Sequence, residues 1–160
     1  MLELRDLSLA DALIVCAGMR PMDRACLRAV MGEISDEEFA ANRWGTTGPA
    51  WAVADSGSPV AIGGISFQSS WSGVVWLVAT PALRRQSWRK LIRHARTVLR
   101  QILDPAHELH RHRVEAYVLG GWEGARALVG HLGFQHEGTR HAAGSRGEDI
   151  ETWALWRRKG

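Results

Sequence analysis

Amphipathic segments, each opened by a helix-start signal, follow a single alternating strand at the beginning of the chain. Residues 2–5 alternate apolar and polar side chains, as a half-buried strand does. Ser8, Pro21 and Ser35 favour the first turn of a helix, because serine caps it and proline fixes its first backbone angle. The pattern predicts one strand and three helices, the third fading near Arg43.

Helical spacing in the first of these helices predicts a buried face. Apolar residues recur every three or four positions up to about Met19, which places their side chains on one side of a helix. The residues expected to point inward are Leu9, Ala12, Leu13, Cys16 and Met19.

The sequence pattern changes from helical to strand-like at Pro49, after which turn clusters separate three predicted strands. Strands are predicted at 50–54, 60–67 and 74–80, with glycine, serine and proline in the turns. The segment 74–80 is almost entirely apolar, which predicts a strand buried on both faces. The middle of the chain is therefore predicted to be an antiparallel meander.

A long arginine-rich helix and a final group of strands are predicted after this meander. The helix follows the segment 81–87 and ends near Leu103, before an Asp-Pro pair. A strand at 114–119, a helix at 122–132 and a hairpin of strands at 134–141 and 150–157 come next. The predicted order is β-α-α-α-β-β-β-α-β-α-β-β, which belongs to the α/β (α+β) class.

Length and composition predict a single domain over residues 1–160. Apolar residues make up 46% of the chain, enough for a sizeable core. No segment has the roughly 18 uninterrupted apolar residues of a membrane span, and acids near the start argue against a secretory signal. We therefore expect a cytoplasmic protein without a membrane partner, in which Cys16 and Cys26 are reduced core residues.

Positive charge is concentrated in one part of the chain. The formal net charge is only +3, but seven basic residues lie between positions 84 and 100. This distribution favours a local anionic ligand over general binding of nucleic acid. Nucleic-acid binding through this helix is the weaker alternative, since no aromatic ladder accompanies the arginines.

The last third of the chain resembles the C-terminal signature of the GNAT acetyltransferase superfamily. The segment 114–153 holds a strand, a break, an amphipathic helix, Leu-Gly-Phe at 132–134, Glu-Gly-Thr-Arg at 137–140 and a closing strand. The element order of nearly the whole chain is similar to that of the superfamily. This resemblance implies a GNAT fold, with a mixed twisted sheet of about six to seven strands and flanking helices.

A narrower likeness involves the N-terminal half and the long helix. The strand at 75–80, then Ala82, Leu83 and the arginine-rich helix, are similar to the tailed-phage acetyltransferase-like family that includes an internal virion protein. The segment Met-Arg-Pro-Met-Asp at 19–23 fits the same family. This resemblance implies a phage or prophage gene, and hence a host cytoplasm or a virion as the location.

The resemblance to the superfamily also implies an acetyl-CoA site where the strands at 74–80 and 114–119 splay apart. The pantetheine arm of the cofactor bonds to the backbone of the first strand. The residues implied there are Leu77, Val78, Ala79 and Thr80. The pyrophosphate is expected at the start of the next helix, where free N–H groups and the helix dipole favour an anion. The residues implied there are Arg84, Arg85, Gln86 and Ser87.

The sequence departs from the superfamily's phosphate loop in one respect. Ser87 stands at the first of two small positions in that loop, whereas Arg89 occupies the second. Two interpretations stay open. Either the arginines grip phosphate with their side chains, or they form a solvated helix face beside a closed pocket.

The candidate catalytic groups lie on the strand at 114–119. The superfamily's general-acid tyrosine falls at Val129, which cannot donate a proton, and Trp122 takes the place of an asparagine. The single tyrosine, Tyr117, and Glu115 share the strand and are the candidates to move protons during acetyl transfer. The plainer alternative is that Glu115 is an exposed strand residue without a catalytic role.

A histidine cluster at 107–112 is similar in composition to a zinc motif, but its spacing does not fit. His107, His110 and His112 are three and two residues apart in a connector, whereas two histidines on one helix face must be four apart. No metal site is therefore predicted.

Two hypotheses from different classes follow. The first is an N-acetyltransferase-like protein that uses acetyl-CoA and an amine acceptor of unknown identity. The second is a catalytically inactive protein of the same fold, either a virion component or a host-directed binder. Arg89, Trp122 and Val129 motivate the second hypothesis, because each replaces a residue that catalysis or cofactor binding uses.

Overall fold

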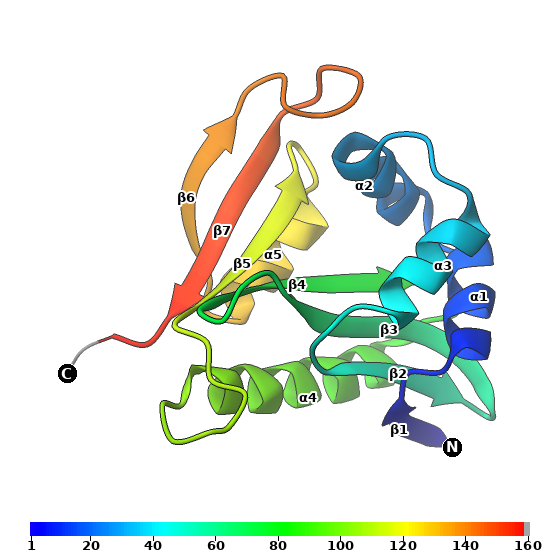
Figure 1. The fold of residues 1–160 in the computed structure, drawn as a ribbon. Coiled ribbons are helices and arrows are strands. Elements are labelled where there is room, and N and C mark those ends of the chain that lie inside the picture. Colours follow the sequence, from blue (N-terminus) through cyan, green and yellow to red (C-terminus); the bar gives the residue numbers. More distant parts are fainter. Residues whose placement is uncertain (159–160) are drawn as a thin grey trace.

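The computed structural model describes residues 1–158 and has the predicted order of elements (Figure 1). The predicted strands and helices are present, with most ends shifted by a residue or two. They are β1 (Leu2–Asp6), α1 (Leu9–Ala17), α2 (Pro21–Met31), α3 (Asp36–Trp44), β2 (Ala50–Asp55), β3 (Ser58–Phe67), β4 (Ser72–Ala79), α4 (Arg85–Leu103), β5 (Arg113–Leu119), α5 (Glu123–His131), β6 (Gln135–Arg140) and β7 (Ile150–Trp156).

The residues predicted to start the first three helices do so. Ser8 Oγ accepts a hydrogen bond from the Asp11 N–H at 3.1 Å, and Ser35 Oγ accepts one from the Glu38 N–H at 3.1 Å. Pro21 occupies the first position of α2. Each serine cap satisfies an N–H group that a helix start otherwise leaves unpaired, so local sequence decides where α1 and α3 begin.

A mixed sheet of seven strands runs in the order β1-β2-β3-β4-β5-β7-β6. Neighbouring strands are antiparallel except β4 and β5, which are parallel. Figure 1 shows α1, α2 and α3 on one side of the sheet and α4 and α5 on the other. Helix α4 supplies the crossover connection that a parallel pair requires.

Each face of the sheet has its own hydrophobic core. On one side, Val114 of β5 packs with Leu99 and Ile102 of α4. On the other, Ile62 of β3 packs with Val15 of α1. Both cores draw on the same strands, because successive side chains of a strand point to opposite faces.

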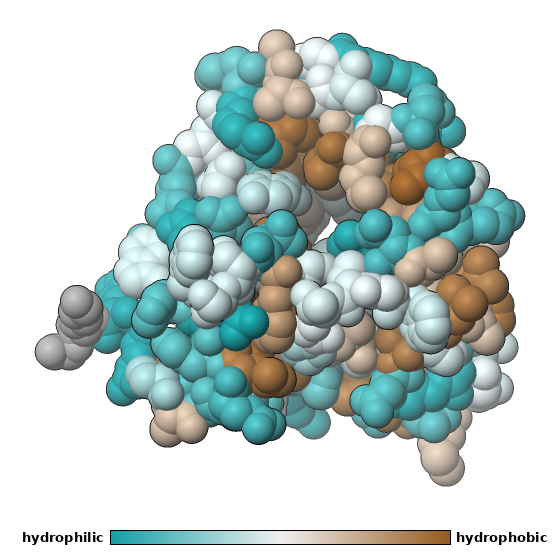
Figure 2. All heavy atoms as spheres, in the orientation of Figure 1, coloured by the Kyte–Doolittle hydropathy of each residue, from teal (hydrophilic) through white to brown (hydrophobic). Residues whose placement is uncertain are grey.

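The predicted inward face of α1 is only partly correct. Cys16 and Met19 are buried, but Leu9 and Leu13 are each 38% exposed, and with Ile14 they form a hydrophobic group over α1 (Figure 2). Helical spacing could not select the buried face, because α1 is apolar on nearly every side. Within residues 1–158, no helix combines the length and the apolar content of a membrane span.

Strand β4 is less buried than its apolar sequence predicts. Only its first residues, from Ser72 to Val74, pair with β5, and the two strands diverge beyond that point (Figure 1). Val75 and Leu77 are therefore only half-buried. The prediction of a strand buried on both faces is wrong over this stretch, because β5 is not beside it.

Gly64→Ala is expected to destabilise the protein by about 1–3 kcal/mol. An added Cβ would lie 2.7 Å from the Pro49 carbonyl oxygen and 2.9 Å from Cζ2 of Trp76, so the backbone or the ring would have to move. Gly130→Ala in α5 is the matched control. Its Cβ would meet no atom within 4 Å, and alanine favours a helix by about 0.5–1 kcal/mol. Urea denaturation measures both variants, and equal stability of wild type and Gly64→Ala would contradict this packing.

Candidate functional site

The divergence of β4 and β5 leaves backbone groups of β4 without a neighbouring strand. The Thr80 N–H donates to the Val60 carbonyl oxygen of β3 at 2.9 Å, and such bonds alternate along an antiparallel pair. The backbone groups of Val78 and Thr80 therefore point to β3, whereas those of Leu77 and Ala79 point into the gap. Of the four backbone contacts predicted for a cofactor, two face the gap.

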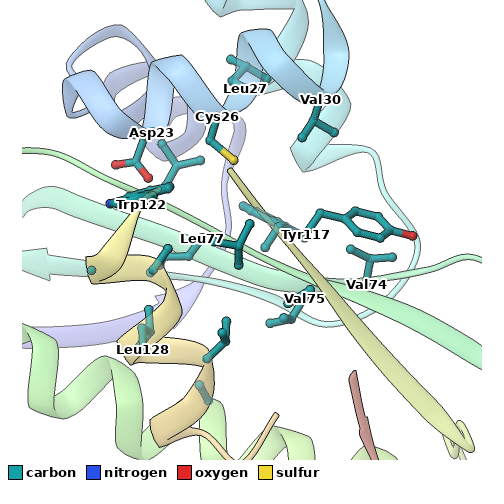
Figure 3. A pocket seen from close by; sticks show the side chains of 18 of the residues that line it. Asp23, Cys26, Leu27, Val30, Val74, Val75, Leu77, Tyr117, Trp122 and Leu128 are labelled. Carbon is teal, nitrogen blue, oxygen red and sulfur yellow. The ribbon is translucent and has the colours of Figure 1, made fainter. Parts of the chain in front are cut away.

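A largely apolar cavity of about 340 Å³ lies at this gap and is lined by α2 and α3 as well as by α4 and α5. Figure 3 shows Leu77 of β4 and Tyr117 of β5 beside it, with Cys26 of α2 on one side and Leu128 of α5 on the other. Its volume is within the range of small-molecule sites. The apolar residues of β4 thus line a pocket where the sequence pattern predicted a closed core.

The start of α2 closes part of the gap. The Arg20 N–H donates to the Ala79 carbonyl oxygen at 2.9 Å, and the Ala79 N–H donates to Asp23 Oδ2 at 3.4 Å. Asp23, only 5% exposed, also accepts a hydrogen bond from Arg20 Nε at 2.6 Å. The chain itself therefore occupies both gap-facing backbone groups of Ala79, and the next gap-facing position along β4 is Leu77.

The guanidinium of Arg20 lies between two tryptophans that flank the gap. It is 5.2 Å from the ring centroid of Trp88 in α4 and 5.7 Å from that of Trp122, which precedes α5. These are cation–π distances. Arg20 therefore bridges the starts of the two helices. Both tryptophans line the cavity, and neither fills it.

The four residues predicted to bind phosphate lie together at the start of α4. Arg84 precedes the helix, and its Nε donates to Asp55 Oδ2 of β2 at 2.8 Å. Arg85 and Gln86 are exposed, whereas Ser87 is fully buried. Within residues 1–158, Ser87 Oγ has no hydrogen-bond partner. The free N–H groups of this first turn, with two exposed polar side chains, make it a place that an anion can occupy.

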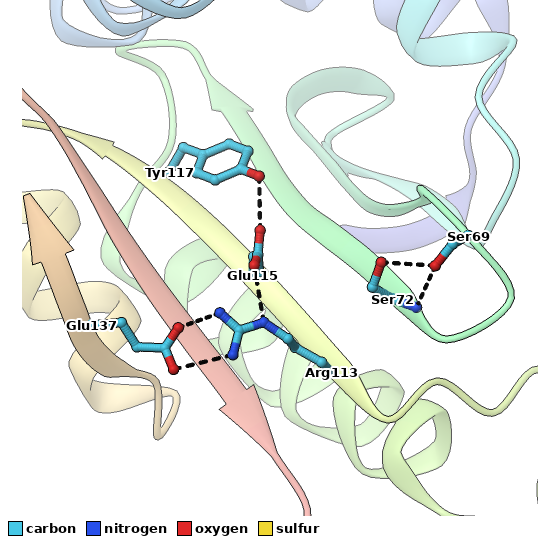
Figure 4. A network of polar contacts seen from close by, with 6 residues as sticks. All are labelled: Ser69, Ser72, Arg113, Glu115, Tyr117 and Glu137. Carbon is cyan, nitrogen blue, oxygen red and sulfur yellow. Dashed lines mark hydrogen bonds and ion pairs between the residues drawn. The ribbon is translucent and has the colours of Figure 1, made fainter. Parts of the chain in front are cut away.

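Glu115 and Tyr117 are in direct contact on one face of β5 (Figure 4). Tyr117 Oη donates to Glu115 Oε2 at 2.7 Å, and Arg113 Nε donates to Glu115 Oε1 at 2.9 Å. Arg113 is also paired with Glu137 of β6. Tyr117 lines the cavity, and Glu115 lies behind it in the hydrogen-bonded chain.

Partial burial is the main cause that raises the pKa of Tyr117 above its ordinary value, and the hydrogen bond to Glu115 adds to it. The positive charges of Arg140 and Arg113 act in the opposite direction. Tyr117 therefore keeps its proton at neutral pH. The ion pair with Arg113 lowers the pKa of Glu137, so that carboxylate stays ionised beside the network.

The histidines at 107–112 lie in the connector between α4 and β5. In the part of the chain that the structure describes, no three histidine, cysteine, aspartate or glutamate side chains converge to hold a metal ion. His110 Nε2 lies 3.2 Å from His112 Nδ1, while Cys16 and Cys26 are free thiols. Val129, at the position of the superfamily's tyrosine, is buried in the core.

Arg20, Asp23 and Arg43 line the cavity, although no motif in the sequence marks them as site residues. Arg20 and Asp23 carried one local signal, since opposite charges three residues apart at a helix start commonly pair. The contact of Asp23 with Ala79 of β4 joins residues 56 positions apart, which no local pattern shows. Arg43 also lines the cavity, and its guanidinium lies over the ring of Trp76.

Solved structures of GNAT acetyltransferases have the same fold as this chain. The ribosomal-protein-S18-alanine N-acetyltransferase from Escherichia coli gives a TM-score of 0.72 at 18% identity, over 100% of this chain and 96% of the other. A protein from Salmonella typhimurium, described as an acetyltransferase and solved with its cofactor acetyl-CoA, gives a TM-score of 0.71 at 15% identity. The match covers 100% of this chain and 96% of the other. An acetyltransferase of the GNAT family from Streptococcus pneumoniae gives a TM-score of 0.63 at 16% identity, over 98% of this chain and 99% of the other.

No model of a known protein family matches the chain, and no curated protein matches its sequence. At these identities the likeness to solved structures establishes the fold. The GNAT fold that the sequence resemblance implies, with a mixed sheet of six to seven strands, is thereby confirmed.

Proposed function

We propose that this protein binds acetyl-CoA in the gap between β4 and β5 and transfers the acetyl group to an amine. The observation that carries the proposal is the cavity of about 340 Å³ where two parallel strands separate beyond Val74. A protein of the same fold was solved with acetyl-CoA as its cofactor, which supports this choice of ligand.

The backbone edge of β4 fits the pantetheine arm of acetyl-CoA. That arm carries amide groups, which need hydrogen-bond partners when they leave water. In the proposal, Leu77 offers its gap-facing N–H and carbonyl groups, and Ala79 offers its own once Arg20 and Asp23 release them. Val78 and Thr80 hold this edge in place through their pairing with β3.

The start of α4 fits the pyrophosphate. Arg85 and Gln86 are exposed and free to approach an anion, and the hydroxyl of Ser87 has no partner within residues 1–158. Arg84 can exchange Asp55 for a phosphate, which arginine binds through paired hydrogen bonds. The exposed Arg85 and Gln86 beside the N–H groups of the first turn of α4 are the observation at this position that favours an anion.

Tyr117 and Glu115 are proposed to carry the proton that acetyl transfer moves. When bound, acetyl-CoA supplies an activated thioester carbonyl. As the new carbon–nitrogen bond forms, Tyr117 Oη accepts the amine proton while its own proton passes to Glu115 Oε2, 2.7 Å away. As the carbon–sulfur bond breaks, Tyr117 gives a proton to the sulfur and Glu115 returns the one it held. Arg113 keeps Glu115 oriented throughout.

Filling the cavity is expected to weaken acetyl-CoA binding about tenfold, because the pantetheine arm needs the space. Ala125 of α5 lines the cavity, so Ala125→Phe places a ring inside it. Ala127→Phe, at an exposed position of the same helix, is the matched control. Isothermal titration calorimetry measures the affinity of each variant. No binding by the wild type at millimolar acetyl-CoA, or equal weakening by both variants, would contradict the proposal.

A second candidate is a non-catalytic protein of the same fold, either a virion component or a host-directed binder. Arg20 and Asp23 favour it, because they occupy Ala79 at the place where a cofactor would bind. The phage-type resemblance of segments 19–23 and 75–80 implies a host cytoplasm or a virion for such a protein. Its presence in purified phage particles without acetyl-CoA binding supports this candidate, and acetyl transfer to a defined amine contradicts it.

A further inference from the structure

An arginine without a carboxylate partner lines the α2–α3 side of the cavity. Arg43, in the last turn of α3, takes part in no ion pair within residues 1–158. Its Nε and Nη2 donate to Asn42 Oδ1 at 3.2 Å and 2.6 Å. Its Nη1 makes no hydrogen bond to any residue that the structure describes, so donors of this guanidinium are available to a ligand.

Aromatic rings hold Arg43 in its position. The guanidinium carbon lies 5.4 Å from the ring centroid of Phe39 and 5.2 Å from that of Trp76. Trp76 packs against Gly64, where any side chain would meet its ring. Gly64, Trp76 and Arg43 therefore form a stack from the sheet outward. Cation–π contact offsets part of the cost of burying the charge, but the rings offer no oxygen to Nη1.

Asp23, an acidic residue that lines the cavity with Arg43, and Asp36 of α3 are already paired with other arginines. Asp36, in the first turn of α3, binds Arg24 at 2.7 Å, and Asp23, which lines the cavity, binds Arg20 at 2.6 Å. Burial lowers the pKa of Arg43, in keeping with the lack of an ion pair to this side chain within residues 1–158. Burial also raises the pKa of the Cys16 thiol to about 12, so that neighbour is uncharged at neutral pH. The lining keeps one uncompensated positive charge.

We propose that Arg43 binds a carboxylate of the acceptor, so that the acetylated amine belongs to an amino-acid-like small molecule with an apolar body. The inference rests on the proposed function for the acetyl donor and the amine. Guanidinium and carboxylate match in geometry through parallel N–H···O bonds. Leu27, Val30 and Val74 line the same cavity and fit an apolar body. A polycationic amine would instead meet the excess positive charge.

Calorimetric titration with L-leucine and L-phenylalanine, and with the amide of each, tests this inference on the full chain with and without CoA. The free acids are expected to bind about tenfold more tightly than the amides, because only they offer an anionic pair of oxygens. Arg43→Gln is expected to abolish this preference, and Arg43→Lys to keep part of it. Arg93→Gln removes the same charge from an exposed position on α4 and is expected to leave the preference unchanged.

Three results would overturn the inference: equal affinity of acids and amides for the wild type, no binding of either at millimolar concentration, or a preference that survives Arg43→Gln. If Arg43→Gln does not fold, the inference is tested by the affinities of the wild type for acids and amides and by the reduced preference expected for Arg43→Lys. Titration with acetyl-CoA in the same series separates the two proposals. Acetyl-CoA binding without a carboxylate preference removes only this inference. A carboxylate preference without acetyl-CoA binding removes acetyl transfer and the acceptor role, and leaves Arg43 as a carboxylate-binding residue.

Discussion

Tyr117→Phe is expected to lower kcat for acetyl transfer about 100-fold, because it removes the hydroxyl that passes a proton between the amine and Glu115. Tyr117 lines the cavity, and its hydroxyl donates a hydrogen bond to Glu115 Oε2 at 2.7 Å. Phenylalanine keeps the ring and its packing, so acetyl-CoA affinity and the free energy of unfolding should stay close to those of the wild type. Release of free CoA thiol with a panel of amines measures kcat.

The raised pKa of Tyr117 gives this prediction a pH dependence of defined sign. Deprotonation at high pH removes the proton that Tyr117 passes on, so activity falls. Because burial and Glu115 raise the pKa of Tyr117, the fall comes above the ordinary tyrosine value of about 10. Disappearance of this alkaline limb in Tyr117→Phe supports the assignment, whereas an unchanged kcat in the variant contradicts it.

Asp23→Ala is expected to destabilise the protein by about 2–3 kcal/mol. The carboxylate is buried and accepts hydrogen bonds from Arg20 Nε at 2.6 Å and from the Ala79 N–H at 3.4 Å. Alanine leaves the Arg20 guanidinium between Trp88 and Trp122 without its counter-charge, and it leaves an N–H of β4 without an acceptor. Chemical denaturation at neutral pH measures the loss.

Asp36→Ala is the matched control for this loss. Asp36 also pairs with an arginine, Arg24, at 2.7 Å, but the side chains of this pair are 28% and 32% exposed. A pair that water reaches contributes less than about 1 kcal/mol, so Asp36→Ala should cost clearly less than Asp23→Ala. Equal losses in the two variants would show that burial of Asp23 adds nothing to its ion pair.

The order of elements was predictable because local signals decide it. Ser8, Pro21 and Ser35 each mark a helix start through chemistry that needs no distant partner. Gly133 closes the predicted helix at φ +96°, a left-handed conformation that glycine adopts without strain. Such features are properties of a few consecutive residues, so the sequence alone shows them.

The packing of those elements was less predictable, since it depends on partners far away in the chain. Of the residues of α1 predicted to point inward, Ala12 and Cys16 are buried, whereas Leu9 and Leu13 are partly exposed. The apolar run of β4 predicted burial on both faces, because hydropathy does not distinguish a residue that lines a cavity from one in a closed core. The divergence from β5 accounts for that difference.

The contacts of the candidate site also differ in how far the sequence predicts them. Glu115 and Tyr117 are two residues apart on one strand, so alternation alone brings their side chains to one face, and they meet at 2.7 Å. Arg43 and Trp76 come from different elements and meet only because Gly64 leaves room for the indole ring. Contacts of this second kind require the folded structure.

The short hydrogen-bonded ladder between β4 and β5 also bears on how the two parts of the sheet open and exchange their amide protons. Strands β1 to β4 form one hydrogen-bonded set, while β5, β7 and β6 form another, and only the residues from Ser72 to Val74 of β4 join them. Regions that share few hydrogen bonds open as separate cooperative units in hydrogen exchange. We therefore expect the amides of the two strand sets to exchange with different rates, and a ligand that bridges the gap to slow exchange in both sets at once.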